Sequence, residues 1–249
     1  MKRITIIFLI TVSFGFSSCD ILQQILDDTS GGGGLTDSEI ISGLKEALIE
    51  GAVSSSKTLN ATDGYFKDNA VKILLPPEAN VIVENLQKVP GLGQSTIDDL
   101  VLKINRAAED AASEAKPIFI DAVKTMTIQD GMTILKGSNT AATNYLKSKT
   151  YNKLVSAFAP KINNSLNKKL VGNVSAGGAW TKVTSLYNKV APFIGKPKVT
   201  TDLGAYVTKK ALNGLFMKVG EEEKKIRANP LAYVSDIIKK VFGYAKNNL

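Results

Sequence analysis

The residues best suited to chemistry in this sequence lie in the stretch NRAAEDAASEA, residues 105–115. Glu109 follows Asn105 by four residues and Arg106 by three, so on a helix these polar side chains share one face, with Asp110 beside them. Paired carboxylates could act as a general acid and base, and a buried polar cluster could bind a ligand. The alternative is an ion pair between Arg106 and Glu109 or Asp110 that holds two helices in register, which is the commoner use of such residues.

Composition excludes most other routes to catalysis. The sequence has no histidine and a single cysteine, Cys19, so it can form neither a Ser-His-Asp nor a Cys-His arrangement and lacks the usual zinc ligands. No D-x-[DN]-x-[DN]-G calcium loop occurs, and the GLG at residues 91–93 lacks the context of a nucleotide fingerprint. We therefore expect no metal, no cofactor and no enzymatic activity, and keep a carboxylate-based hydrolase around Glu109 as an alternative.

Cys19 follows a segment that is typical of an exported protein. Lys2 and Arg3 precede the uncharged apolar run 4–16, and two serines come directly before the cysteine. This order indicates a secretory signal peptide, and the apolar run is shorter than the about 20 residues of a membrane-spanning helix. The cysteine at this point resembles the lipobox of bacterial lipoproteins, in which the thiol carries a diacylglycerol. The alternative is an ordinary signal peptide with an incidental cysteine.

The lipobox resemblance implies an address in the bacterial cell envelope. Residues 1–18 would be removed, and acyl chains on Cys19 would anchor the chain in a membrane. Residues 19–34, which end in GGGG, would form a flexible tether, and a domain outside the cytoplasm would begin near Leu35. Asp20 occupies a position that affects membrane sorting differently in different bacteria, so the inner and the outer membrane both stay open.

Charge is distributed unevenly along the chain, whose net charge is +8. Residues 19–130 contain nine Lys or Arg and 18 Asp or Glu, whereas residues 131–249 contain 20 and five. One interpretation is that the two halves pack together and partly neutralise each other. The other is that the lysine-rich region 131–201, which contains no acid, binds an anionic envelope component or a protein partner. Because lysine does not read bases bidentately, we expect no nucleic acid.

Two smaller groups of residues have a structural and a functional interpretation. Arg106 and Arg227 are the only arginines after Arg3, and Arg227 follows Glu223 at the best spacing for a helical ion pair, so we interpret both as structural. The aromatic residues of the basic region could stack on sugars or lie at a membrane interface, but at helical spacing they more often belong to the core. These aromatic residues are Tyr145, Tyr151, Phe158, Trp180 and Tyr187.

The pattern of residues 35–249 predicts a single all-α domain of about nine helical segments, because apolar residues recur at helical spacing and no period of two is sustained. Thr36 and Glu39 form a capping box that opens a helix to about Asn60. Ser95 is expected to cap a helix that runs from Thr96 to about Lys116. Other helices are expected from Pro77, between Thr127 and Gly137, and over residues 139–149, 151–170, 178–194, 203–228 and 230–246, with residues 71–77 extended.

Several stretches together resemble one protein family. NRAAEDAASEAKPIF, DAVKTMTIQDGMTILKG, AATNYLKSKT and EEEKKIRANP occur in this order, after DGYFKDNAVKILLP. Over essentially all of residues 35–249, the chain is similar to bacterial secreted proteins known only as a domain of unknown function, family four-one-nine-seven. The resemblance implies one helical secreted domain and transfers no catalytic residue.

These observations favour a lipid-anchored, all-α envelope protein that binds or scaffolds a partner without enzymatic activity. A hydrolase of envelope polymers would instead need two convergent acids about 5–10 Å apart in a cleft. A carrier of a lipid or other small molecule would need an apolar cavity between helices. A binding module would present a lysine face without an acid-lined cleft.

Overall fold

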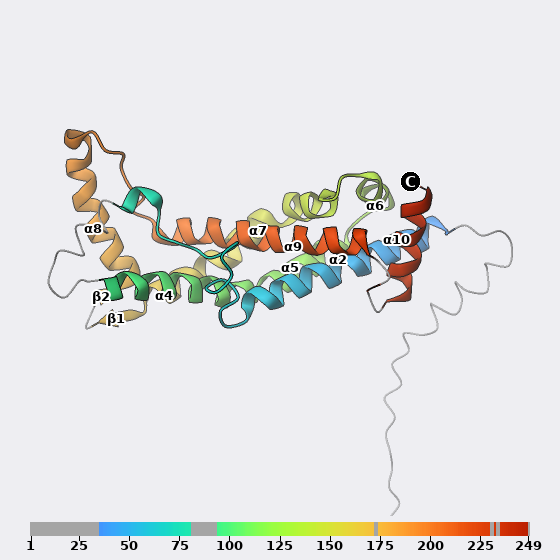
Figure 1. The fold of residues 1–249 in the computed structure, drawn as a ribbon, viewed down its shortest axis with the longest axis horizontal. Helices are drawn as coiled ribbons and strands as arrows, with labels where there is room; N and C mark the ends of the chain where they lie inside the picture. Colours follow the sequence, from blue (N-terminus) through green and yellow to red (C-terminus); the bar gives the residue numbers. More distant parts are fainter. Residues whose placement is uncertain (1–34, 81–93, 172–173, 230–231, 233–234, 249) are drawn as a thin grey trace, which may run out of the picture. The chain divides into compact units, whose positions relative to one another are not determined.

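The computed structural model describes residues 35–80, 94–171, 174–229, 232 and 235–248 (Figure 1). The predicted signal peptide, Cys19 and the predicted tether lie outside the described residues. Residues 36–249 group as one compact unit, and its fold is all-α, as predicted. Its helices are α2 (Asp37–Asn60), α4 (Gln94–Ala112), α5 (Ala115–Lys124), α6 (Ile128–Lys136), α7 (Ala141–Asn167), α8 (Ala176–Val190), α9 (Leu203–Ala228) and α10 (Asp236–Asn248). Short elements are the 3₁₀ turns η1 (Pro77–Ala79) and η2 (Ala191–Ile194) and an antiparallel pair, β1 (Lys169–Val171) with β2 (Val174–Ser175).

Two helices begin with capping boxes, and the sequence predicted both starting points. The Thr36 hydroxyl accepts from the Glu39 N–H at 3.2 Å, and the Glu39 carboxylate accepts from the Thr36 N–H at 2.9 Å. Thr127 and Asp130 repeat this exchange at the start of α6, at 3.1 Å in both directions. Each box satisfies backbone N–H groups that the first turn of a helix leaves without partners.

The core lies among α2, α4, α5, α7 and α9, and α9 packs against both α2 and α7 (Figure 1). The largest side chains that are fully buried there are Leu44, Leu59, Ile104, Phe119, Leu146, Leu154, Phe158, Ile162, Leu166 and Leu212. The second half of α4 can approach α7 closely because four of its buried side chains are small. These are Ala107, Ala108, Ala111 and Ala112, each 0% exposed. No helix in the described part of the chain is long and apolar enough to span a membrane.

Some predicted boundaries were wrong. The expected helices over 139–149 and 151–170 form one helix, α7, which continues past Pro160. Pro160 lies on an exposed side of α7, so solvent can reach the carbonyl that the missing N–H leaves without its helical partner. The helix expected from Thr96 to Lys116 is instead divided between α4 and α5, and Pro117 sits in the first turn of α5, where proline is tolerated. Ser95 is inside α4 rather than at its cap, and α10 begins at Asp236.

α8 and the segment after it form a paired unit that we call the α8 arm, residues 176–201. The indole N–H of Trp180 donates to the Thr200 carbonyl at 2.9 Å. The Asn188 side chain donates to the Val199 carbonyl at 2.7 Å and accepts from the Val199 N–H at 2.8 Å. These contacts hold the returning chain along α8, and α8 packs against α7 and α9 (Figure 1).

Candidate functional site

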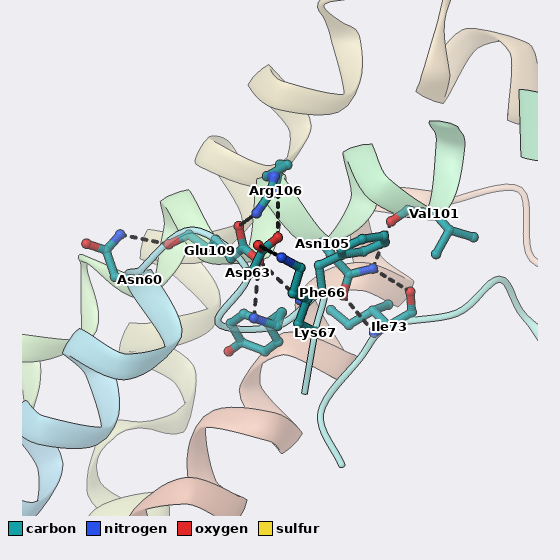
Figure 2. Close-up of polar contacts among 10 residues, drawn as sticks. Asn60, Asp63, Phe66, Lys67, Ile73, Val101, Asn105, Arg106 and Glu109 are labelled. Atoms are coloured by element: carbon teal, nitrogen blue, oxygen red, sulfur yellow. Dashed lines mark hydrogen bonds and ion pairs between the residues drawn. The ribbon is translucent and has the colours of Figure 1, made fainter. Parts of the chain in front are cut away.

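The predicted polar cluster lies where the segment 61–76 runs across α4 (Figure 2). The side chains of Asn105, Arg106 and Glu109 all form hydrogen bonds with this segment. Asp110 does not join them, because it lies on the exposed side of the helix; its backbone carbonyl accepts from the Ser113 hydroxyl at 2.8 Å. The structure therefore brings together three of the four predicted residues.

Glu109 is the centre of the cluster and is only 4% exposed. Its Oε1 accepts from the backbone N–H groups of Tyr65 at 3.2 Å and Phe66 at 3.1 Å, and its Oε2 accepts from Arg106 at 2.6 Å. The Asn60 side chain donates to the Glu109 carbonyl at 2.8 Å. A buried carboxylate is tolerated when it is paired and hydrogen-bonded, and both oxygens of this one are already engaged by the fold.

Arg106 bridges Glu109 to Asp63, with 2.7 Å between its Nη2 and Asp63 Oδ1. The Lys67 ammonium lies 2.8 Å from the other Asp63 oxygen (Figure 2). Lys67 and Arg106 together hold the pKa of Asp63 below its usual value, and the two carboxylates raise the pKa of Arg106. Sequence analysis missed Asp63, although the Asp-Gly pair it forms with Gly64 is a turn signal, and Asp63 has a left-handed φ of 71°.

Asn105 is completely buried and acts on the same segment through its amide. Its Oδ1 accepts from the Ile73 N–H at 2.8 Å, and its Nδ2 donates to the carbonyls of Ile73 at 2.8 Å and Val101 at 2.7 Å. The side chain thus pairs with both backbone groups of Ile73, much as a neighbouring strand would. This explains why the predicted extended segment around Ile73 needs no sheet to satisfy its polar groups.

The cluster is poorly suited to acid–base chemistry or to metal binding. The lowered pKa of Asp63 keeps it ionised at neutral pH, and the Arg106 guanidinium contacts both carboxylates. In the segments that the structure describes, no group of three or more acidic or thiol side chains could hold a metal ion. Of the four principal cavities in these segments, none is lined by Asp63, Arg106 or Glu109.

The four cavities also bear on the carrier alternative. One lies in the interior among α2, α7, α9 and α10, is lined mostly by apolar side chains, and has a volume of about 20 Å³. Pockets for drug-sized ligands usually measure about 300–1,000 Å³. The other three, of about 600, 480 and 460 Å³, are open surface grooves rather than enclosed cavities.

Arg227 forms a second network of the same kind as Arg106. It pairs with Glu223 at 3.0 Å, at the spacing that the sequence predicted, and donates to the Ile134 carbonyl at 2.8 Å in the last turn of α6. Glu223 accepts from the backbone N–H groups of Ala142 at 3.0 Å and Thr143 at 2.8 Å in the first turn of α7. α7 has no side-chain cap of its own, so Glu223 supplies one from α9. Sequence analysis missed this role because no local pattern links residues 80 positions apart.

The lysines of the second half divide into paired and unpaired groups. Four of them form ion pairs with acids of the first half: Lys153 with Asp121, Lys161 with Glu114, Lys218 with Asp68 and Lys240 with Glu39. The four lysines of the α8 arm are exposed and form no ion pair with a described residue: Lys182, Lys189, Lys196 and Lys198. Mutual neutralisation therefore applies to these four pairs of the helical bundle, whereas no described acid forms an ion pair with a lysine of the α8 arm.

Comparison with known proteins places the chain in a family. No curated protein and no solved structure shows significant similarity to it. A family model, however, matches residues 34–243, a span that contains both arginine networks and the α8 arm. The match confirms the resemblance that the sequence motifs indicated. The chain therefore belongs to the family described as Protein of unknown function (DUF4197).

Proposed function

We propose that this protein is a lipid-anchored, non-enzymatic binding module of the bacterial cell envelope. Cys19 carries the acyl chains, and the lysine-rich region 131–201 holds an anionic envelope component. One observation supports the binding role most directly, namely that the exposed lysines of the α8 arm form no ion pair with a described residue. No acid occurs in the sequence from Gly131 to Thr201. These lysines therefore have no acid within their own region with which to form an ion pair.

The physical basis of binding is electrostatic. Several unpaired lysines on one arm create a local positive potential that attracts anions and is screened by salt. The competing functions have less support. The carboxylates that a hydrolase would need are engaged by Arg106 and by backbone N–H groups, and the interior cavity of about 20 Å³ is small for a carried lipid.

The binding role is tested with dextran sulfate, a soluble anionic polymer, and the full chain. One variant combines four substitutions: Lys182→Gln, Lys189→Gln, Lys196→Gln and Lys198→Gln. We expect it to bind dextran sulfate several-fold more weakly than the unaltered chain, and its affinity to depend less steeply on salt concentration. The matched control is Lys153→Gln with Lys161→Gln, which removes lysines of the same region that are already paired. Equal losses in the two variants, or no binding by the unaltered chain, would contradict the proposed role.

The anchor is tested separately in cells supplied with labelled palmitate. Because Cys19 is the only cysteine in the sequence, Cys19→Ser should abolish the label and release the protein from the membrane fraction. A variant that stays labelled and membrane-bound would rule out this anchor.

A further inference from the structure

The end of the α8 arm exposes large apolar side chains that the proposed electrostatic binding does not use. Leu186 and Val190, one helical turn apart, are 58% and 51% exposed, and Phe193 and Ile194 in η2 are 88% and 55% exposed. We call these four residues the apolar tip. Single exposed apolar residues are common on protein surfaces, but four large ones within residues 186–194, at the end of one arm, indicate an interaction site.

The apolar tip is not the face that packs α8 onto the rest of the protein. Trp180 and Thr184, which are 5% and 0% exposed, lie on the buried side of the helix, about 120° around its axis from Leu186 and Val190. α8 therefore carries apolar residues on two sides, and only one of them is used within the described fold.

Local backbone contacts hold the tip in shape. The Lys196 N–H donates to the Ala191 carbonyl at 3.0 Å, and the Gly195 N–H donates to the Pro192 carbonyl at 3.4 Å, which closes a turn after Ile194. Gly195 adopts a φ of 64°, and this left-handed conformation suits glycine. With Asn188 pairing to Val199 below it, the turn presents Phe193 at a fixed apex.

Lysines are the charged neighbours of the apolar tip along the sequence, in which residues 131–201 contain no acid. Lys189 lies between Leu186 and Val190 in the sequence, and Lys196 and Lys198 follow Ile194; all three are exposed and form no ion pair with a described residue. The next acid along the chain is Asp202, which is occupied in capping α9. An apolar apex with basic neighbours matches the two layers of an anionic membrane surface, acyl chains beneath phosphate headgroups.

We propose that the apolar tip inserts into the surface of an anionic lipid bilayer, with Phe193 and Ile194 among the acyl chains. Lys189, Lys196 and Lys198 then lie at the phosphate headgroups. This inference rests on the proposed function and identifies its anionic component as lipid. A fluid headgroup layer needs no complementary groove to receive an exposed apex, and the three lysines supply charge complementarity to it.

The test measures the surroundings of the tip directly in the full chain. Cys19→Ser removes the native thiol, and Phe193→Cys then provides one site for the environment-sensitive fluorophore NBD. The matched control is Met217→Cys on α9, another exposed apolar position, at 46%. Because residues 1–34 are the same in both proteins, they cannot produce a difference between the two sites.

With phosphatidylglycerol vesicles we expect NBD at position 193 to shift to the blue and to be quenched by lipids that carry a doxyl group on the acyl chain. NBD at position 217 should stay in water. Adding Lys189→Gln, Lys196→Gln and Lys198→Gln should raise the lipid concentration for half-response by about fivefold per lysine. Phosphatidylcholine vesicles should give a much weaker response, since they lack the net negative charge.

Three results would overturn the insertion, and they separate it from the proposed function. If position 193 stays in water while dextran sulfate still binds, the tip does not insert but anion binding stands. If neither vesicles nor dextran sulfate bind, both proposals fail. If vesicles have no effect and a photo-crosslinker at position 193 forms a protein adduct in cells, the tip is instead a protein-docking site.

Discussion

At the scale of single residues, the two arginine networks explain why a lysine-rich chain keeps these two arginines. Arg106 reaches two carboxylates at once, and Arg227 reaches a carboxylate and a helix carbonyl. A planar guanidinium can satisfy several acceptors in fixed directions, whereas a lysine ammonium offers a point charge on a flexible stem. Both arginines therefore connect segments that are distant in sequence.

Glu109 and Asp110 offer a matched pair for testing this structural role. Glu109→Gln removes the charge but keeps the shape, and should lower the free energy of unfolding by about 2–3 kcal/mol, because it leaves Arg106 with a weaker partner. The expected loss is smaller than for a fully buried pair, since the Arg106 side chain is 39% exposed. Asp110→Asn, on the exposed side of the same helix, should change the value by less than about 0.5 kcal/mol. Urea unfolding measures both.

The opposite ranking of these two variants would show that Glu109 is not a structural centre. If Glu109→Gln loses a binding activity while its free energy of unfolding is unchanged, the cluster has a functional rather than a structural role.

The residue-scale predictions succeeded where partners are close in sequence. The spacing of Arg106 with Glu109, and of Glu223 with Arg227, predicted ion pairs that the structure contains. Asp110 was grouped with them, but one further residue turns a helix by about 100°, which takes its side chain to another face. The partner Asp63 lies 43 residues from Arg106, and no local pattern encodes such a contact.

At the scale of elements, helix starts that a local capping box marks were predictable, whereas helix junctions were not. The starts of α2 and α6 depend on local exchanges between Thr36 and Glu39 and between Thr127 and Asp130, which the sequence displays. Whether a helix continues past a proline depends on what surrounds it. α7 continues past Pro160 because its buried side packs against α4 and α9 along its length, and this packing outweighs the local penalty.

Pro160 should therefore lower the stability of α7 relative to a residue that has a backbone N–H. Replacing Pro160 with alanine restores a backbone N–H that can pair with the Ser156 carbonyl, and should raise the free energy of unfolding by about 1–2 kcal/mol. The gain falls short of the full cost of a helix proline because alanine also frees the unfolded chain. Pro117→Ala is the control, since an N–H in the first turn of α5 gains no helical partner. A rise in the urea midpoint for both variants alike would refute the argument.

At the scale of the whole molecule, the charge gradient along the sequence has two roles. Across the bundle, acids of the first half meet lysines of the second, as at Lys240 with Glu39 and Lys218 with Asp68. On the α8 arm the lysines form no such pairs within the described residues. The sequence shows the charge gradient but not which lysines form ion pairs, because only the fold determines which lysines lie near an acid.

The acids of the bundle also predict how stability depends on pH. The pKa of Glu39 is lowered by the Thr36 N–H and by Lys240, that of Asp68 by Lys218, and that of Asp130 by Thr127. A carboxylate with a lowered pKa stabilises the fold above its ordinary pKa, and this stability is lost as pH falls through the lowered pKa. Because the sequence has no histidine, we expect urea midpoints to change little between about pH 5.5 and 8 and to fall below about pH 4.5.

Glu39→Gln isolates one contribution to that acid-sensitive stability. At pH 7 it removes the charge that holds Lys240 and the cap of α2, so the variant should unfold at lower urea than the unaltered protein. Below the lowered pKa of Glu39 the native carboxyl is protonated as well, so the two urea midpoints should converge as the solution becomes more acidic. Glu46→Gln lies on the exposed face of the same helix, and its urea midpoint should differ little from that of the unaltered protein at every pH. A gap that stays constant down to about pH 2 would mean that Glu39 acts through its shape alone, since linkage requires the gap to close.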